Sequence, residues 1–194
     1  FRPSINECPA DSFIQRKDSN TEVPLPSKEV VKWLSLARLS AYDVSRYGRN
    51  MCTNLVLNNS KQLTYINLLY DSKVVKLEVN SCINIESMDP LYGVGETLQE
   101  LSARHVPFDL NFTNFKALTS LNIRGNTEFR QYDTLVHLIE LSSLAIGQTD
   151  RLTNLDFLPS LHRLVQFGIT NPSTIRDWSG LAEYKQATRQ FEYS

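Results

Sequence analysis

Residues 118–126 read Leu-Thr-Ser-Leu-Asn-Ile-Arg-Gly-Asn, and this stretch decides the fold. Apolar residues stand at its first, fourth and sixth positions, and the residues between them are polar. The alternation around Leu121 and Ile123 is typical of a short strand with one buried face. Residues 141–149, Leu-Ser-Ser-Leu-Ala-Ile-Gly-Gln-Thr, have the same arrangement. The two copies begin 23 residues apart, which indicates a repeated structural unit.

The same arrangement returns along most of the chain. Six copies begin at positions 52, 74, 98, 118, 141 and 164, with separations of 22, 24, 20, 23 and 23 residues. After the strands, apolar residues lie three apart, as at Leu152, Leu155, Leu158 and Leu161. That spacing suits a 3-10 or short α-helical segment. A near-constant period of this size predicts a solenoid, and a helical bundle, the alternative, fits the alternation in the strands poorly.

This pattern resembles the leucine-rich repeat, which reads L-x-x-L-x-L-x-x-N/C-x-L over roughly 20 to 29 residues. The resemblance covers residues 52–194 and is to the short type of repeat. It implies an α/β solenoid, with parallel strands on the concave face and short helical or 3-10 segments on the convex face. The chain departs from the family at the ninth position, which holds Ser60, Cys82, Val106, Asn126, Thr149 and Pro172. Since only one of these is Asn, we expect some turns to satisfy their backbone groups in another way.

The N-terminal third predicts two further segments. Residues 1–24 are rich in Pro, Ser, Asn and charge, which indicates an irregular arm. Residues 25–50 predict a helical cap before the repeats of 51–194, with Ser27 as the N-cap of a first helix. The stretch that starts with Leu25-Pro26 also resembles a degenerate F-box, although the Trp that the family has after Cys52 is missing. That resemblance implies an alternative function, a substrate receptor of a cullin ubiquitin ligase.

The C-terminal end continues the period into the start of a seventh repeat. Residues 190–193 alternate as another strand does, with Phe191 and Tyr193 at the apolar positions. The chain stops inside this unit, so we expect the native protein to continue beyond Ser194 or this edge to be covered by another chain. A free strand edge invites pairing, and end-to-end self-association is one form that it can take.

Composition and motifs argue against several functions. Basic and acidic residues number 20 and 21, which leaves no basic excess for nucleic-acid binding. No apolar run approaches the roughly 18 residues that span a membrane. Metal-binding HExxH, phosphate-binding and nucleophile-elbow motifs are absent, and His105, His137 and His162 lie far apart in the sequence. We predict no catalytic residue, no metal, no cofactor and no enzymatic activity.

The compartment stays open at this stage. Three cysteines, at positions 8, 52 and 82, make an odd and widely spaced set, which favours reduced thiols and an intracellular protein of the cytoplasm or nucleus. Sequons at Asn58 and Asn111 point instead to secretion. No signal-peptide pattern is present, but the chain begins at Phe1 and not at Met, which indicates a cut or processed segment.

The outward residues of the strands form the candidate site. Stacking the repeats lines their third, fifth and seventh positions into three columns on the concave face. These columns are polar, carry their charges in the middle repeats and lack large aromatic anchors. The candidate partner-binding residues are Lys76, Glu78, Glu100, Arg104, His105, Asn122 and Arg124. We predict a protein–protein interaction module that is part of a larger protein or complex; the alternative is a solvated concave face with binding at the end strand or the N-terminal arm.

Overall fold

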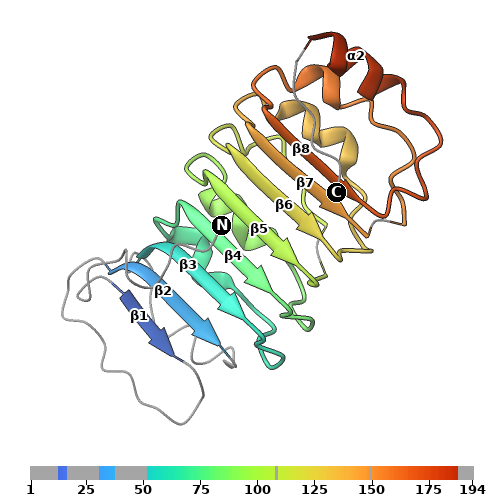
Figure 1. The fold of residues 1–194 in the computed structure, drawn as a ribbon. Coiled ribbons are helices and arrows are strands. Elements are labelled where there is room, and N and C mark those ends of the chain that lie inside the picture. Colours follow the sequence, from blue (N-terminus) through green and yellow to red (C-terminus); the bar gives the residue numbers. More distant parts are fainter. Residues whose placement is uncertain (1–12, 17–30, 38–51, 108, 149, 188–194) are drawn as a thin grey trace.

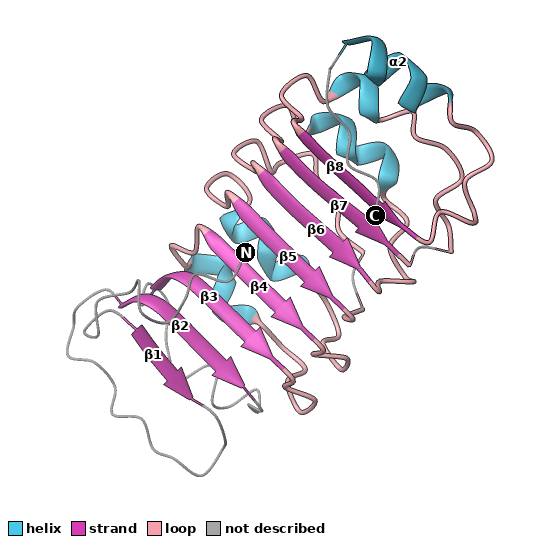
Figure 2. Cartoon of the chain, viewed as in Figure 1, coloured by secondary structure: helices cyan, strands magenta, loops and turns pink. Residues whose placement is uncertain are grey.

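Eight parallel strands form a single sheet in chain order (Figures 1 and 2). The structure, a computed structural model, describes residues 13–16, 31–37, 52–107, 109–148 and 150–187. The strands are β1 (Phe13–Arg16), β2 (Val31–Ala37), β3 (Cys52–Asn58), β4 (Lys76–Asn80), β5 (Glu100–Arg104), β6 (Ser120–Arg124), β7 (Ser143–Gly147) and β8 (Gln166–Thr170). Short 3-10 helices lie on the other face of the sheet: η3 (Asn67–Asp71), η4 (Asp89–Val94), η5 (Tyr132–His137) and η6 (Leu158–Ser160). One α-helix, α2 (Ser179–Ala187), lies at the C-terminal end of the described sheet.

All six strands that the repeat predicts are confirmed, as β3 to β8. In β4, β5 and β6 the second and fourth residues are buried and the others are only partly buried. The strands pair without a shift, so Leu55, Leu77, Leu101, Leu121, Leu144 and Phe167 form one buried row. The period of the sequence therefore sets the register of the sheet.

The prediction of a helix after Ser27 is wrong for Val31–Ala37, which is strand β2. The sequence Val31-Lys-Trp-Leu34-Ser-Leu36 has the spacing of the repeat, and Leu34 and Leu36 pair in register with Leu55 and Leu57. The same apolar residues fit a helical face, and pairing with β3 overrides that local preference. The F-box interpretation needs a helix here and is not supported. The remainder of the predicted cap, residues 25–30 and 38–50, lies outside the described residues.

The irregular arm predicted for residues 1–24 contains strand β1, which pairs in parallel with β2. The arm prediction is therefore wrong for Phe13–Arg16. The other residues of that range lie outside the described part of the chain.

Each of the six repeats turns through a residue with positive φ directly after its strand. These residues are Asn59, Ser81, His105, Gly125, Gln148 and Asn171, with φ between 50° and 68°. The backbone N–H groups of the first five donate to the last residue of the next strand, over N···O distances of 2.9 to 3.2 Å. Only Gly125 avoids the steric penalty of this conformation, which Asn tolerates better than most residues.

The ninth-position side chains join neighbouring turns where their chemistry allows it. Asn126 is buried; its Nδ2 donates to the carbonyl of Ala103 (2.6 Å), and its Oδ1 accepts from the N–H of Val106 (3.0 Å). Cys82 donates from Sγ to the equivalent carbonyl, that of Leu57 (3.7 Å), whereas the Ser60 hydroxyl donates within its own turn to Asn58 (3.1 Å). The expected incomplete ladder is confirmed, and the backbone bonds between turns supply part of the rest.

The convex side packs through apolar side chains at three-residue spacing. Leu152, Leu155, Leu158 and Leu161 are all buried. In the middle repeats aromatic rings replace leucines: Phe112 meets Phe115 and Phe129 at 5.5 and 5.9 Å, and Phe129 meets Tyr132 at 4.6 Å between centroids. Tilted and edge-on arrangements of this kind are the favoured ones for aromatic pairs.

Helix α2 covers the C-terminal end of this convex layer. Leu181 and Tyr184 are buried, and the Tyr184 hydroxyl donates to the carbonyl of Leu164 at 2.5 Å. The N–H of Ser179 donates to the Asp177 carboxylate at 2.9 Å, and this bond lowers the pKa of Asp177. The predicted seventh strand, at residues 190–193, lies outside the described residues and stays a prediction.

Candidate functional site

The three predicted columns lie in register on the concave face, by which we mean the sheet face opposite the 3-10 helices (Figure 2). From β3 to β8 the first column holds Asn54, Lys76, Glu100, Ser120, Ser143 and Gln166; the second holds Val56, Glu78, Ser102, Asn122, Ala145 and Gly168; the third holds Asn58, Asn80, Arg104, Arg124, Gly147 and Thr170. The structure thus brings six of the seven candidate residues onto one surface. His105 is the exception, because it follows β5.

His105 lies at the edge of this face, in the turn after β5. Its φ is 51°, and its ring lies against Gly125, where a Cβ atom would collide with it. His105 is exposed. Gly125, which lacks a side chain, therefore leaves room for the imidazole of His105. His105 lies at the edge of the three columns.

Two ion pairs neutralise four of the charges in the columns. Lys76 pairs with Glu100 on the neighbouring strand, and Arg104 pairs with Glu78 at 3.2 Å. All four side chains remain 32 to 46% exposed, so each pair contributes on the order of 0.2 to 1 kcal/mol to stability. The pairs set the direction of these side chains more than they hold the fold together.

Two asparagines extend the second pair into a network. Asn80 donates from Nδ2 to Asn58 (2.8 Å) and to Glu78, and its Oδ1 accepts from Nε of Arg104 (3.1 Å). Asn58 and Asn80 were not among the candidate site residues. Their positions in the third column could have identified them, because Asn80 is the register partner of Arg104 and Asn58 is that of Asn80.

A second group of polar atoms in the columns has no such partners. Within the described residues, Oγ of Ser102, Oδ1 of Asn122 and Nε of Arg124 are buried atoms that make no hydrogen bond. Ser102 and Asn122 are cross-strand neighbours, and Arg124 follows Asn122 on the same face of β6. Ser102 was not among the candidate site residues; the repeat places it in the second column, but its lack of a hydrogen-bond partner is visible only in the structure.

Small residues surround this group on the C-terminal side. Gly147 is the register partner of Arg124, and Ala145 and Gly168 continue the second column. A Cβ atom at Gly147 would meet Cγ of Arg124 at 3.4 Å, and one at Gly168 would lie 3.9 Å from a terminal nitrogen of the guanidinium. The side chain of Arg124 therefore extends across β7 toward β8.

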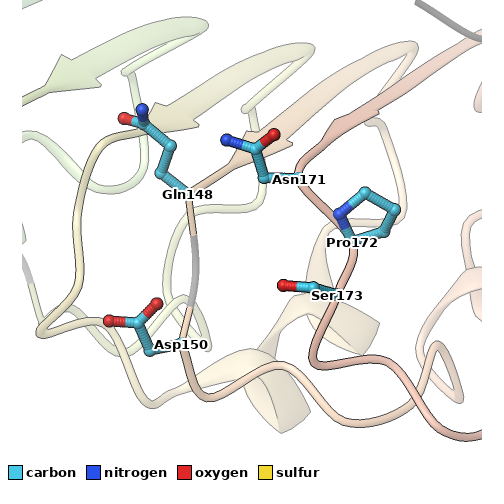
Figure 3. A pocket seen from close by; sticks show the side chains of 5 residues that line it. All are labelled: Gln148, Asp150, Asn171, Pro172 and Ser173. Carbon is cyan, nitrogen blue, oxygen red and sulfur yellow. The ribbon is translucent and has the colours of Figure 1, made fainter.

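An open hollow lies just past the ends of β7 and β8. Its volume is about 550 Å³, and it is lined by Gln148, Asp150, Asn171, Pro172 and Ser173 (Figure 3). The two loops that form it carry Gln148 and Asn171, the positive-φ residues that follow the strands. The hollow extends the polar surface beyond the third column.

The two sequons differ in their surroundings. Asn58 belongs to the concave network, and Ser60 of the same sequon is buried. Asn111 is partly exposed, and its Oδ1 accepts from the hydroxyl of Thr113 at 2.6 Å. Of the two sequons, only that of Asn111 is accessible at both its asparagine and its hydroxyl residue.

Neither a metal site nor a membrane span is found in the part of the chain that the structure describes. No three or more His, Cys, Asp or Glu side chains come together there to hold a metal ion. No helix there is long and apolar enough to cross a membrane. His137, in η5, and His162, after η6, are exposed on the convex side.

Comparisons with known proteins agree with this architecture. No protein-family model matches the chain, and neither does any curated protein. Among solved structures, the chain is similar to an internalin C2 from Listeria monocytogenes str. 4b F2365, with a TM-score of 0.55 and 18% sequence identity over 84% of this chain and 81% of that chain. At this identity the likeness concerns the fold alone. The repeat, the parallel sheet and this likeness together show a leucine-rich-repeat-type α/β solenoid.

Proposed function

We propose that the chain is a protein-recognition module that binds a macromolecular partner through its concave face. The supporting observation is the set of three polar columns that runs in register across β3 to β8, on a face that the 3-10 helices do not cover. Such a surface is broad and polar, and complementary charges on it supply specificity and association rate. The proposed contact residues are Lys76, Glu78, Glu100, Arg104, His105, Asn122 and Arg124.

The test reverses the positive charges in the middle of this face. The full chain and its Arg104→Glu/Arg124→Glu variant are immobilised, and the proteins that each retains from an extract are compared. The partner is a protein that the wild type retains, and its affinity is then measured in purified form. We expect the double reversal to weaken that affinity several-fold or more. Stability should change by about 1 kcal/mol or less, because the Arg104–Glu78 pair is half-exposed.

The matched control reverses two exposed arginines outside the strands. Arg130→Glu/Arg151→Glu changes the net charge by the same amount and leaves the three columns intact. We expect this variant to bind as the wild type does. Binding that survives the concave reversal, or that both variants lose equally, would show that the partner docks elsewhere or that only overall charge matters.

A further inference from the structure

The charges of the concave face do not balance. Its columns from β3 to β8 contain five charged side chains: Lys76, Glu78, Glu100, Arg104 and Arg124. The first four form two ion pairs with one another. Arg124 is in none of the ion pairs of the described residues, and its buried Nε makes no hydrogen bond there. The positive charge of this face is therefore concentrated at one guanidinium.

The surroundings of Arg124 are those of an incomplete polar site. Its Nε is covered, as are Oδ1 of Asn122 and Oγ of Ser102, and none of the three makes a hydrogen bond within the described part of the chain. Buried polar atoms in native proteins nearly always have a protein, water or ion partner, so these three atoms mark a part of the face where an ordered water or a ligand is expected beside Arg124. Because Arg124 as a whole is only partly buried, its terminal nitrogens remain open to such a ligand.

The neighbouring strands leave space for that ligand. Ala145 and Gly168 line the face on the C-terminal side of Arg124. Gly147 is buried beneath the side chains of Thr170 and Arg124, and the guanidinium extends toward Gly168. No long side chain of β7 competes for this position. Arg104, by contrast, donates from Nε to Asn80 and from one terminal nitrogen to Glu78.

We propose that Arg124 is the anchor of the concave face and binds an Asp or Glu side chain of a partner protein. A carboxylate matches the fork of terminal guanidinium donors and can form two parallel hydrogen bonds with it. This inference rests on the proposed function and adds to it the chemistry that the partner must present.

The experiment selects peptides on the full chain. A random dodecapeptide phage library is panned against the wild type, and enriched peptides are synthesised and measured for affinity. We expect them to share a fixed Asp or Glu. Replacing that residue by Asn or Gln should lower the affinity at least tenfold. Arg124→Gln should cause a similar loss, and the two changes together should cause little more. Arg130→Gln, the matched control at an exposed arginine outside the strands, should change the affinity less than threefold, and Arg124→Lys should lie between.

A blocking variant separates this proposal from the proposed function. Ala145→Arg places a long side chain on the concave face beside Arg124. Thermal unfolding of every variant checks that it folds. Some peptides could lose affinity in the Ala145→Arg variant and keep it in the Arg124→Gln variant. That result would contradict the role proposed for Arg124 and would still support binding at the concave face. Peptides that are indifferent to both substitutions would count against both proposals. A selection that yields no peptide dependent on Arg124 also overturns the anchor.

Discussion

At the ninth position of its repeat, Asn126 joins two backbone groups of the preceding turn. It is buried and bonds both the carbonyl of Ala103 and the N–H of Val106. Cys82 reaches the equivalent carbonyl but offers no acceptor of comparable strength, and the Ser60 hydroxyl donates to the carbonyl of Asn58 in its own turn. The ninth-position side chains of this solenoid thus bond to the backbone of the turns in three different ways.

Replacing Asn126 should therefore be costly. Asn126→Ala leaves a buried N–H and a buried carbonyl without that partner, and we expect it to lower the free energy of unfolding by about 2 to 4 kcal/mol. Asn126→Cys should cost less, because a thiol can donate to the carbonyl as Cys82 does. Denaturant unfolding measures both variants. Thr127→Ala, at an exposed neighbour, should stay within about 0.5 kcal/mol, and an equally small effect at Asn126 would contradict the assigned role.

Cys82 makes a prediction about pH. Burial raises the pKa of its thiol above the ordinary value of 9.0, against the lowering effect of hydrogen bonds with Ser60 and Asn80. The unfolded chain therefore loses this proton at a lower pH than the folded chain. The protonated thiol of Cys82 therefore stabilises the folded state. This contribution is fully present below the unfolded-state pKa of about 9 and is lost as the pH rises through the higher pKa of the folded state.

The measurement is the free energy of unfolding between pH 8 and 10.5, in a Cys8→Ser/Cys52→Ser background. Stability should fall more steeply with pH when Cys82 is present than in the matching Cys82→Ala variant. The Ala variant starts from a lower stability because of its cavity, so the slopes are compared and not the absolute values. Parallel curves for the two proteins would show that the thiol titrates alike in both states.

At the scale of elements, one apolar spacing led to two different structures. Val31, Leu34 and Ala37 fit a helical face, yet Val31–Ala37 is strand β2. Near the other end, Ile175, Leu181 and Tyr184 are buried at spacings of six and three residues, and residues 179–187 are helix α2. The difference lies in what each segment packs on, since β2 pairs along β3 and α2 contacts η6.

Tyr184 should hold α2 in place. Tyr184→Ala removes a large buried ring and should lower stability by about 3 to 5 kcal/mol. Tyr184→Phe keeps the ring and removes the hydroxyl that donates to the carbonyl of Leu164, for a loss of about 1 kcal/mol. Thermal unfolding compares both variants with Glu183→Ala, an exposed change on the same helix. If Phe costs as much as Ala, the hydrogen bond and not the packing is what matters.

At the scale of the whole molecule, the contacts are nearly one-dimensional. Each described strand contacts only its neighbours in the chain, and the 3-10 helices and α2 likewise contact adjacent units. In such an array, stability is close to a sum of single repeats and the interfaces between neighbours. The middle units have two interfaces, whereas a terminal unit has one.

This arrangement predicts graded protection from hydrogen exchange. Backbone amides of β5 and β6 should exchange slowest, and those of β1 fastest, because opening at an end breaks fewer interfaces. Protection should decline less steeply toward β8, since α2 packs on that end of the sheet. Native-state exchange followed by mass spectrometry of peptides tests the gradient. Equal protection from β3 to β8 would instead indicate one cooperative unit.

The sequence by itself determined the repeat, the positions and register of β3 to β8 and the membership of the three columns. It could do so because side-chain direction alternates locally along a strand, and a constant period repeats that alternation from turn to turn. The spacing at 31–36 shows the limit of such reasoning, because a short apolar pattern fits either a helix or a strand until its neighbour is known.

Only the tertiary structure decided which charges of the columns pair. Lys76 meets Glu100, and Arg104 meets Glu78, each across neighbouring strands, while Arg124 extends over Gly147 without a partner in the described chain. The partners stand 24 and 26 residues apart in the sequence, and each long side chain could turn toward several neighbours. Their choice depends on the space and the charge that adjacent strands present, which no local pattern contains.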